Sequence, residues 1–279
     1  MSEVDVASTL NKELERLAAE RKARAIAVAL HDIESGLRFS LHGDRWFHAA
    51  STIKVAVLLA VFRAADEGRL RLTDSLHVRN RFISVAEGVP FHLSRDSDAM
   101  SELYKRIGRV AKISELTEGM IVASSNLATN LLLDYLGVEY ARKVLRDAQV
   151  EGVELRRGVE DHSAHEKDIK NQVTANGLLT LLAALRGDFL SAKSKEQAIR
   201  ILLEQRFDSM IPAGLPAHAV VAHKTGEIST ACHDMGIVYL PEREPYLAVI
   251  LTEFDSDRNG RRETVAAISE AIYRSVMRS

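Results

Sequence analysis

The sequence predicts an α/β protein whose sheet is built from both ends of the chain, with a helical region inserted between its strands. Alternating apolar residues predict strands at 25–32 and 37–41, joined by a turn at Ser35-Gly36. Three further strands are predicted late in the chain, at 218–222, 235–240 and 246–251. The residues between these two groups carry the apolar spacing of helices. This order favours one sheet shared by the two chain ends.

Two amphipathic helices are expected to flank this sheet. Leu10, Leu14 and Leu17 follow the i, i+4, i+7 spacing of one buried stripe, which predicts a helix over 5–22. A similar stripe predicts a final helix over 261–277.

The inserted region begins with an apolar run at 55–65, which predicts a helix buried on all sides and opened by Ser51. Gly137 is a suitable helix C-cap and Thr174 a suitable N-cap. The polar segments 70–112 and 150–173 are expected to form loops and short helices. Further helices are predicted at 113–121, 126–136, 174–185 and 195–206.

The composition excludes several classes of partner and structure. The chain has 279 residues and a formal net charge of −2, which gives no electrostatic case for nucleic acid or an anionic membrane as the main partner. No apolar run approaches the roughly 20 residues of a membrane span. Cys232 is the only cysteine, so an intramolecular disulfide is excluded.

Ser51 and Lys54 are three residues apart at the start of the predicted buried helix. This spacing brings the two side chains within reach of each other. Burial lowers the basicity of a lysine, so its neutral amine can accept a proton from a serine. Alone, the pair is more typical of a helix cap followed by a solvated lysine.

Two more motifs change that interpretation. Ser124-Ser125-Asn126 lies in a short connection between predicted helices, and Lys224-Thr225-Gly226 lies on a predicted late strand beside another strand. In this order the three motifs match the set Ser-x-x-Lys, Ser-Asp-Asn and Lys-Thr-Gly of serine β-lactamases and penicillin-binding proteins.

The chain therefore resembles the class A serine β-lactamases and their penicillin-recognising relatives. The resemblance is carried by FHAASTIK at 47–54, MIVASSNLATN at 120–130 and AHKTG at 222–226. It implies a β-lactamase/transpeptidase-like fold, in which an antiparallel sheet from both chain ends with flanking helices accompanies an all-helical lobe. The implied organisation is a single catalytic domain over 1–279, with a sheet lobe at 1–50 and 216–279 and a helical lobe at 51–215.

The resemblance also implies residue roles. Ser51 is expected to be the acylated nucleophile, Lys54 its base, Ser124 a proton relay and Glu160 the base for hydrolysis. The expected substrate-binding residues are Asn126, Lys224, Thr225, Gly226 and Glu227. The backbone N–H groups of Ser51 and Glu227 would form the oxyanion hole, and Asn130 would hold a neighbouring loop.

Three departures from the family pattern bear on turnover. Ala164 stands four residues after Glu160, where class A enzymes have an Asn that helps hold the hydrolytic water. Ser125 replaces the usual Asp of the second motif. Glu227 adds a negative charge near the expected binding site of an anionic substrate.

The sequence gives weaker support for other kinds of catalytic or metal site. Asp161, His162 and His165 form a polar cluster that is interpreted as a solvated loop rather than a metal site. His223 is expected to point away from the side of its strand that carries Lys224. Cys232 is expected to be buried rather than nucleophilic.

The sequence therefore favours a serine hydrolase that opens a β-lactam amide through a Ser51 acyl-enzyme. The alternatives are an esterase or D-alanyl peptidase-like hydrolase with weak β-lactam turnover, and a non-catalytic binding module of the same fold. A small-molecule substrate is expected, with no cofactor and no metal. The N-terminus lacks a secretory pattern, which predicts a cytoplasmic protein if the chain is complete and a periplasmic or secreted one if a signal peptide was removed.

Overall fold

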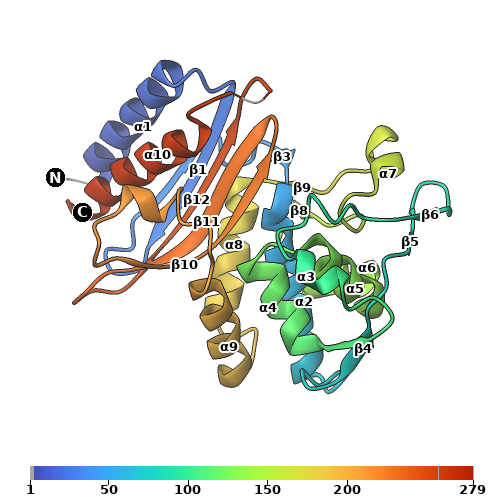
Figure 1. Ribbon diagram of the computed structural model, residues 1–279. Helices are drawn as coiled ribbons and strands as arrows, with labels where there is room; N and C mark the ends of the chain where they lie inside the picture. Colours follow the sequence, from blue (N-terminus) through green and yellow to red (C-terminus); the bar gives the residue numbers. More distant parts are fainter. Residues whose placement is uncertain (1–2, 257, 279) are drawn as a thin grey trace. The chain divides into compact units, whose positions relative to one another are not determined.

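The computed structural model describes residues 3–256 and 258–278 (Figure 1). The chain forms two compact units, each of which is described by itself. The sheet unit comprises Met1–Thr52, Val173–Ala183 and Phe207–Ser279. The helical unit comprises Ile53–Gln172 and Ala184–Arg206. The single catalytic domain with lobe boundaries after residues 50 and 215 stays a prediction.

The sheet unit contains a five-stranded antiparallel sheet in the order β10-β11-β12-β1-β2. Its strands are β1 (Ala25–Asp32), β2 (Arg38–Leu41), β10 (Val220–Ile228), β11 (Ala231–Tyr239) and β12 (Tyr246–Glu253). Strands from the two chain ends pair directly, as in the match of Ala29 with Val249. The predicted α/β class and the sheet built from both ends are confirmed.

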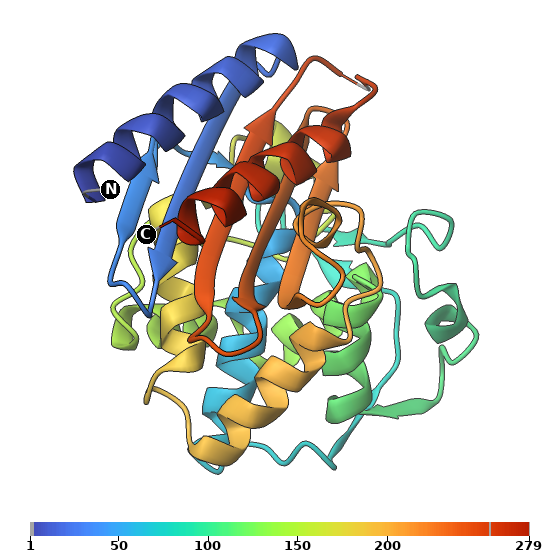
Figure 2. The same cartoon turned by 90° about the vertical axis from the view of Figure 1, so that its left-hand side faces the viewer.

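Helices α1 (Glu3–Glu20) and α10 (Arg261–Val276) pack on each other and lie across the same face of the sheet (Figure 2). Leu10 and Leu14 of α1 and Val265 of α10 are buried in one apolar core with side chains of the sheet. The predicted amphipathic stripes are therefore confirmed, because these faces remove apolar surface from water.

The other elements of the sheet unit are short or begin near its boundary. They are β3 (Phe47–His48), the 3-10 helix η1 (Ala50–Ile53), β9 (Gln172–Val173), α8 (Ala175–Arg186) and the 3-10 helix η2 (Pro212–Gly214). The Thr174 hydroxyl accepts a hydrogen bond from the Gly177 N–H at 3.0 Å, which confirms the predicted N-cap.

The helical unit is arranged around α2 (Lys54–Asp66), of which ten residues are fully buried. Its neighbours in contact are α5 (Asn126–Leu136), α6 (Val138–Asp147), α9 (Ala192–Leu203) and α4 (Ile113–Val122). Gly137 has φ +82° and ends α5, as predicted. Helix α6 was not predicted, although its buried residues Ala141, Val144 and Leu145 have the i, i+3, i+4 spacing of a helix.

The segment 70–112 differs from the expected loops and short helices. It contains two small antiparallel pairs, β4 (Ser75–His77) with β7 (Val110–Lys112) and β5 (Phe82–Ile83) with β6 (Pro90–Phe91), and one short helix, α3 (Ser101–Tyr104). Strands of two or three residues are too short to show an alternating pattern. The segment 150–173 contains β8 (Val153–Glu154) and α7 (His162–Glu166).

Within the described ranges, the structure has no helix with the length and apolar character needed to cross a membrane.

Candidate functional site

In the sheet unit, Ser51 lies in η1, directly before α2. The preceding residue, Ala50, has φ +45°, a left-handed conformation that is unusual for a residue with a side chain. Ile53, rather than Ser51, is the residue before the first α-helical residue, and no side chain caps the helix there. The serine is thus set in a tight, strained turn instead of a conventional N-cap.

Strand β10 approaches this turn closely. A Cβ atom built on Gly226 would lie 3.0 Å from the backbone nitrogens of both Ser51 and Thr52. A side chain at this position would press on the turn, so glycine favours the close approach. The Ser51 amide therefore lies beside the strand that carries the third motif.

The remaining β10 residues of interest have distinct partners. Lys224 is fully buried, and its Nζ donates to the Thr225 carbonyl at 2.8 Å. The Glu227 carboxylate accepts hydrogen bonds from Arg261 at 3.1 Å and Arg262 at 2.9 Å, both at the start of α10. These ion pairs offset the negative charge that the sequence suggested would repel an anionic substrate.

His223 and Cys232 have structural environments. The buried His223 ring lies 3.1 Å from the Asp234 carboxylate on the neighbouring strand. Cys232 is buried, and this burial raises the pKa of its thiol to about 12, so the thiol stays protonated at neutral pH.

In the helical unit, the fully buried Lys54 amine lies among three oxygen acceptors. Its Nζ donates to the Ser124 carbonyl at 2.7 Å, the Ser124 hydroxyl at 3.1 Å and Asn126 Oδ1 at 2.7 Å. Burial lowers the pKa of Lys54 to about 7, and the nearby carboxylates of Asp98 and Glu160 oppose that shift. A substantial fraction of neutral amine is therefore present at neutral pH.

The second motif is placed by the start of α5. Ser124 has φ +55°, which aligns its carbonyl and hydroxyl with the Lys54 amine at the cost of backbone strain. Ser125 caps the helix, since its hydroxyl accepts from the Ala128 N–H at 3.2 Å. Asn126 is the first residue of α5.

The structure brings Glu160 to the same group. Its Oε1 accepts from Asn126 Nδ2 at 2.6 Å and from the Ser97 hydroxyl at 3.2 Å. Glu160 has φ +57°, so it too adopts a left-handed backbone conformation. Ala164, four residues after Glu160, is buried in α7 and offers no polar side chain.

The Glu160 loop, residues 156–171, contains the short helix α7 and is held to its surroundings by side-chain hydrogen bonds. Asn130 donates to the Val159 carbonyl at 2.9 Å and accepts from the Val159 N–H at 2.8 Å, as its expected supporting role requires. Arg157 Nε donates to the Ile169 carbonyl at 2.7 Å, and Asn171 bonds both ways with the Arg157 backbone.

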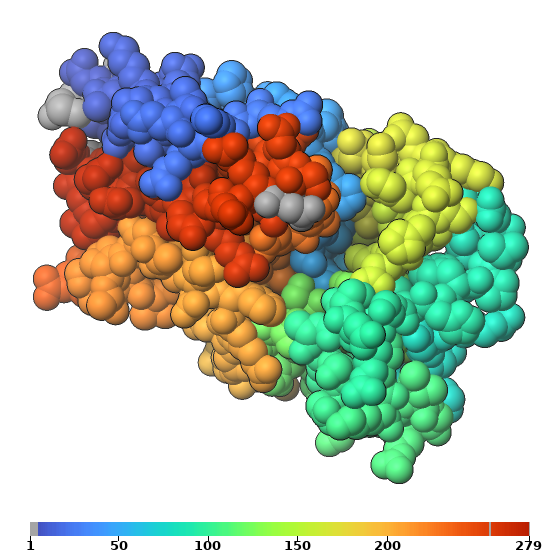
Figure 3. All heavy atoms as spheres, turned by 45° about the horizontal axis from the view of Figure 1, so that its top comes forward, coloured from blue at the N-terminus to red at the C-terminus, as the bar shows by residue number. Residues whose placement is uncertain are grey.

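The interpretation of Asp161, His162 and His165 as a solvated cluster was wrong for Asp161, whereas the two histidines are exposed. Asp161 is buried rather than solvated, and its carboxylate accepts from the Ser84 hydroxyl at 2.8 Å, the Val85 N–H at 3.0 Å and the Ala164 N–H at 3.1 Å. The 82–91 hairpin thus packs against the loop, and the surfaces of these two segments lie side by side in Figure 3. Ser84 is 77 residues from Asp161, so no local pattern indicated the contact.

Asp98 was also missed by the sequence analysis. Its buried carboxylate accepts from the Ser125 hydroxyl at 3.1 Å and from the Leu127 N–H at 2.9 Å. The signal that could have found it is the exchange of Asp for Ser in the second motif, which leaves the start of α5 without its usual carboxylate.

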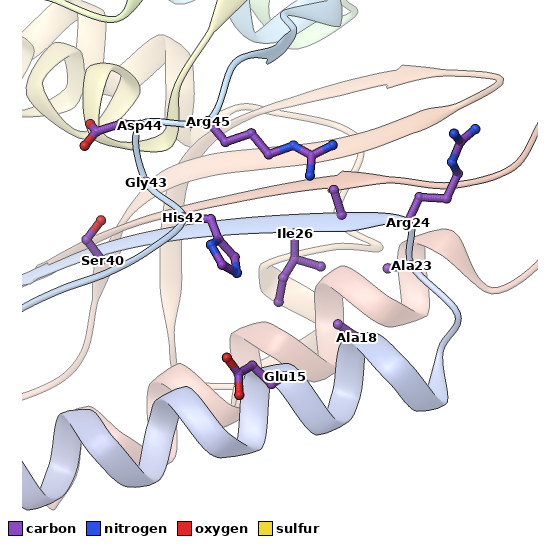
Figure 4. A pocket seen from close by; sticks show the side chains of 11 residues that line it. Glu15, Ala18, Ala23, Arg24, Ile26, Ser40, His42, Gly43, Asp44 and Arg45 are labelled. Atoms are coloured by element: carbon purple, nitrogen blue, oxygen red, sulfur yellow. The ribbon is translucent and has the colours of Figure 1, made fainter.

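One further hollow lies away from these residues. A cavity of about 660 Å³ in the sheet unit is lined by α1, β1 and the turn after β2, including Glu15, His42 and Arg45 (Figure 4). None of the predicted site residues lines it. The described ranges contain no group of three or more His, Cys, Asp and Glu side chains placed to hold a metal ion.

Comparisons with known proteins agree with the motifs. The model of the beta-lactamase enzyme family matches residues 9–276. Beta-lactamase ROB-1 of Haemophilus influenzae is 27% identical over 276 residues, covering 96% of this chain and 85% of that protein. A beta-lactamase of Proteus vulgaris is 24% identical over 283 residues, covering 98% of this chain and 88% of that protein.

Solved structures extend the similarity to the fold. PBP-A has a TM-score of 0.82 and 25% identity, covering 97% of both chains. An ancestral class A beta-lactamase has a TM-score of 0.82 and 26% identity, covering 95% of this chain and 99% of that one. The chain therefore belongs to the beta-lactamase enzyme family and has the fold shared by class A β-lactamases and PBP-A.

Proposed function

We propose that this protein is a serine hydrolase that opens the amide of a β-lactam through an acyl-enzyme on Ser51. The observation that carries the proposal is the buried Lys54 amine, whose pKa is lowered to about 7 and which bonds to Ser124 and Asn126. A buried lysine of this kind is a base suited to a serine nucleophile. We also propose that 1–279 acts as a single catalytic domain.

In the acylation step, the Ser51 Oγ–H proton passes to the neutral Lys54 amine as the oxygen attacks the β-lactam carbonyl. The carbonyl oxygen becomes an oxyanion that the N–H groups of Ser51 and Glu227 stabilise, each worth about 10²–10³ in rate. The C–N bond then breaks, and Ser124 passes a proton to the departing nitrogen while Lys54 restores the Ser124 proton. The product is an ester on Ser51 and a ring-opened amine.

Substrate binding is assigned mainly to the third motif. Lys224 and Thr225 would bind the substrate carboxylate, and Gly226 would let the substrate lie against the strand. The closeness of Gly226 to the Ser51 amide supports this role, because any larger residue would fill that space. Asn126 would form a hydrogen bond with the substrate's side-chain amide.

Hydrolysis of the ester is assigned to Glu160. Its carboxylate would take a proton from a water molecule while the water oxygen attacks the ester carbonyl, and Ser51 would leave with a proton returned to it. The bond from Asn126 to Glu160 supports this assignment. Ala164 provides only a methyl group where the family's Asn would help hold that water, so we expect slow turnover.

The second candidate is an esterase or D-alanyl peptidase-like hydrolase. Ala164 favours it, because poor support of the hydrolytic water would make a β-lactam ester long-lived while a smaller acyl group could still be released. The similarity to PBP-A is compatible with it. A mutant of PBP-A was solved as an acyl-enzyme complex with penicillin G, with a TM-score of 0.83 and 25% identity to this chain.

The test is intact-mass spectrometry of the protein mixed with penicillin G, sampled from seconds to hours, beside Ser51→Ala. A mass increase of one penicillin that requires Ser51 is expected, followed by slow clearance as penicillin is consumed. An adduct that never clears, together with turnover of simple esters, would favour the second candidate. Absence of any Ser51-dependent adduct with penicillin or ester probes would overturn both and leave a binding module.

A further inference from the structure

Asp98 lies in the segment between the 82–91 hairpin and α3, and it is only 5% exposed. One carboxylate oxygen, Oδ2, accepts from the Ser125 hydroxyl at 3.1 Å and the Leu127 N–H at 2.9 Å. The Tyr104 hydroxyl also donates to it at 3.3 Å, and Oδ1 accepts from the Met100 N–H at 2.9 Å. A buried carboxylate with four donors is held in one orientation.

These bonds meet at the N-terminus of α5. The first turn of a helix leaves N–H groups without intrahelical partners, and its dipole favours a negative charge there. The Asp98 carboxylate accepts a hydrogen bond from the Leu127 N–H. The Ser125 hydroxyl accepts one from the Ala128 N–H and donates one to the Asp98 carboxylate. The two side chains together provide the cap and the charge.

Ser125 lies between Ser124 and Asn126, the two residues that contact the Lys54 amine. In the Ser-Asp-Asn form of this motif the carboxylate belongs to the central residue itself. We propose that Asp98 is a positioning residue that supplies this carboxylate from a separate segment and so holds Ser124 and Asn126 in place. The inference rests on the proposed function, because it assigns Asp98 to the same acylation step.

The charge of Asp98 has a second effect. Within the helical unit, the carboxylates of Asp98 and Glu160 are the negative charges that stabilise the Lys54 ammonium against its burial. Neutralising Asp98 would therefore make the Lys54 amine easier to deprotonate. A residue that supported the fold without placing its charge near Lys54 would not shift the pH dependence of acylation to lower pH when it is neutralised.

The experiment exchanges the residues at positions 98 and 125. The variants are Asp98→Asn, Asp98→Ser and the double exchange Asp98→Ser with Ser125→Asp. Asp96→Asn is the matched control, since it removes the same charge from an exposed side chain two residues earlier. Acylation by penicillin G is followed by intact mass at several pH values, with wild type and Ser51→Ala in the same series.

We expect Asp98→Asn and Asp98→Ser to slow acylation by about 10–100-fold, the range for losing a hydrogen bond to a charged group. The acid limb of the acylation profile should move to lower pH in Asp98→Asn. The double exchange should recover most of the rate and return the acid limb, and Asp96→Asn should match wild type. Unchanged acylation in Asp98→Asn, or a folded double exchange as slow as Asp98→Ser, would overturn the proposal.

Failure of the proposed function is recognised separately, because wild type would then form no adduct. In that case a double-mutant cycle on the urea unfolding of Asp98→Ser, Ser125→Asp and the double exchange still tests the pairing. Recovery of stability in the double exchange is expected, and additive losses would contradict the inference.

Discussion

The helical unit holds its two proposed proton acceptors in different ways. Lys54 is the first residue of α2, a helix buried along most of its length, and its acceptors belong to the start of α5. Glu160 lies in the 156–171 loop with a left-handed backbone, and its neighbours are fixed by Asn130 and by the Asp161 contact with the hairpin.

This difference separates the two halves of the proposed reaction. Packed helices move only as units, whereas a loop held by a few side-chain bonds can shift when one bond is lost. We therefore infer that substitutions in the loop or the hairpin affect hydrolysis of the ester while leaving its formation nearly intact. The predictions below test that separation.

The largest effect is expected at Lys54. Lys54→Met retains much of the side-chain volume and removes the amine, so acylation should slow by about 10²–10⁴-fold, the usual range for a general base. The proposed base in wild type is the neutral amine, so the acylation rate should rise with pH through about 7 and then level off. Stopped-flow acylation between pH 5.5 and 8.5 measures both. A flat profile would contradict this role.

The next effect is expected at Glu160. Glu160→Gln preserves shape and hydrogen-bond acceptance but cannot take a proton, so hydrolysis of the ester should slow by about 10²–10³-fold. The acylation rate should stay within about threefold of wild type. Intact-mass time courses give both rates. The control is Glu166→Gln, which changes an exposed residue of α7. An equal fall in its rate of ester hydrolysis would show that the loop merely tolerates no substitution.

The smallest effect is expected at Ser84. Ser84→Ala removes the hydroxyl that bonds to Asp161, and hydrolysis should slow by about tenfold as the loop loosens. Glu87→Gln is the control, because it changes an exposed side chain of the same hairpin that bonds to Lys167 and Ser163 rather than to Asp161. The ratio of ester-formation to ester-hydrolysis rates is the measurement. A matching fall in both rates would mean that the hairpin supports the helices as well as the loop.

Much of the fold could be predicted from local pattern. Strand β1 and helix α5 have the predicted limits, because the first is bounded by polar residues and the second by Ser125 and Gly137. Strands β10 and β11 are longer than predicted. Their extra residues include Lys224 and Asp234, which are polar yet fully buried, so hydrophobic patterning could not detect them.

In the candidate site too, residues in local motifs could be predicted, whereas long-range contacts could not. Lys54, Ser124 and Asn126 were predicted from motifs, and the structure brings them together. Their catalytic roles remain predictions. The missing Asp of the second motif indicates that a carboxylate must come from elsewhere, but no local pattern points to Asp98, which is 27 residues from Ser125. The contact between Ser84 and Asp161 could not be predicted, because it joins segments 77 residues apart.

The pairing of Glu227 with Arg261 and Arg262 has a consequence for the encounter with substrate. Two guanidinium groups bind the Glu227 carboxylate, and Glu263 is a further negative charge close to Arg262, so the four charges balance at this end of β10. A balanced cluster exerts little force on a distant anion and leaves little for salt to screen. We therefore expect Glu227 to leave the approach of an anionic molecule almost independent of ionic strength.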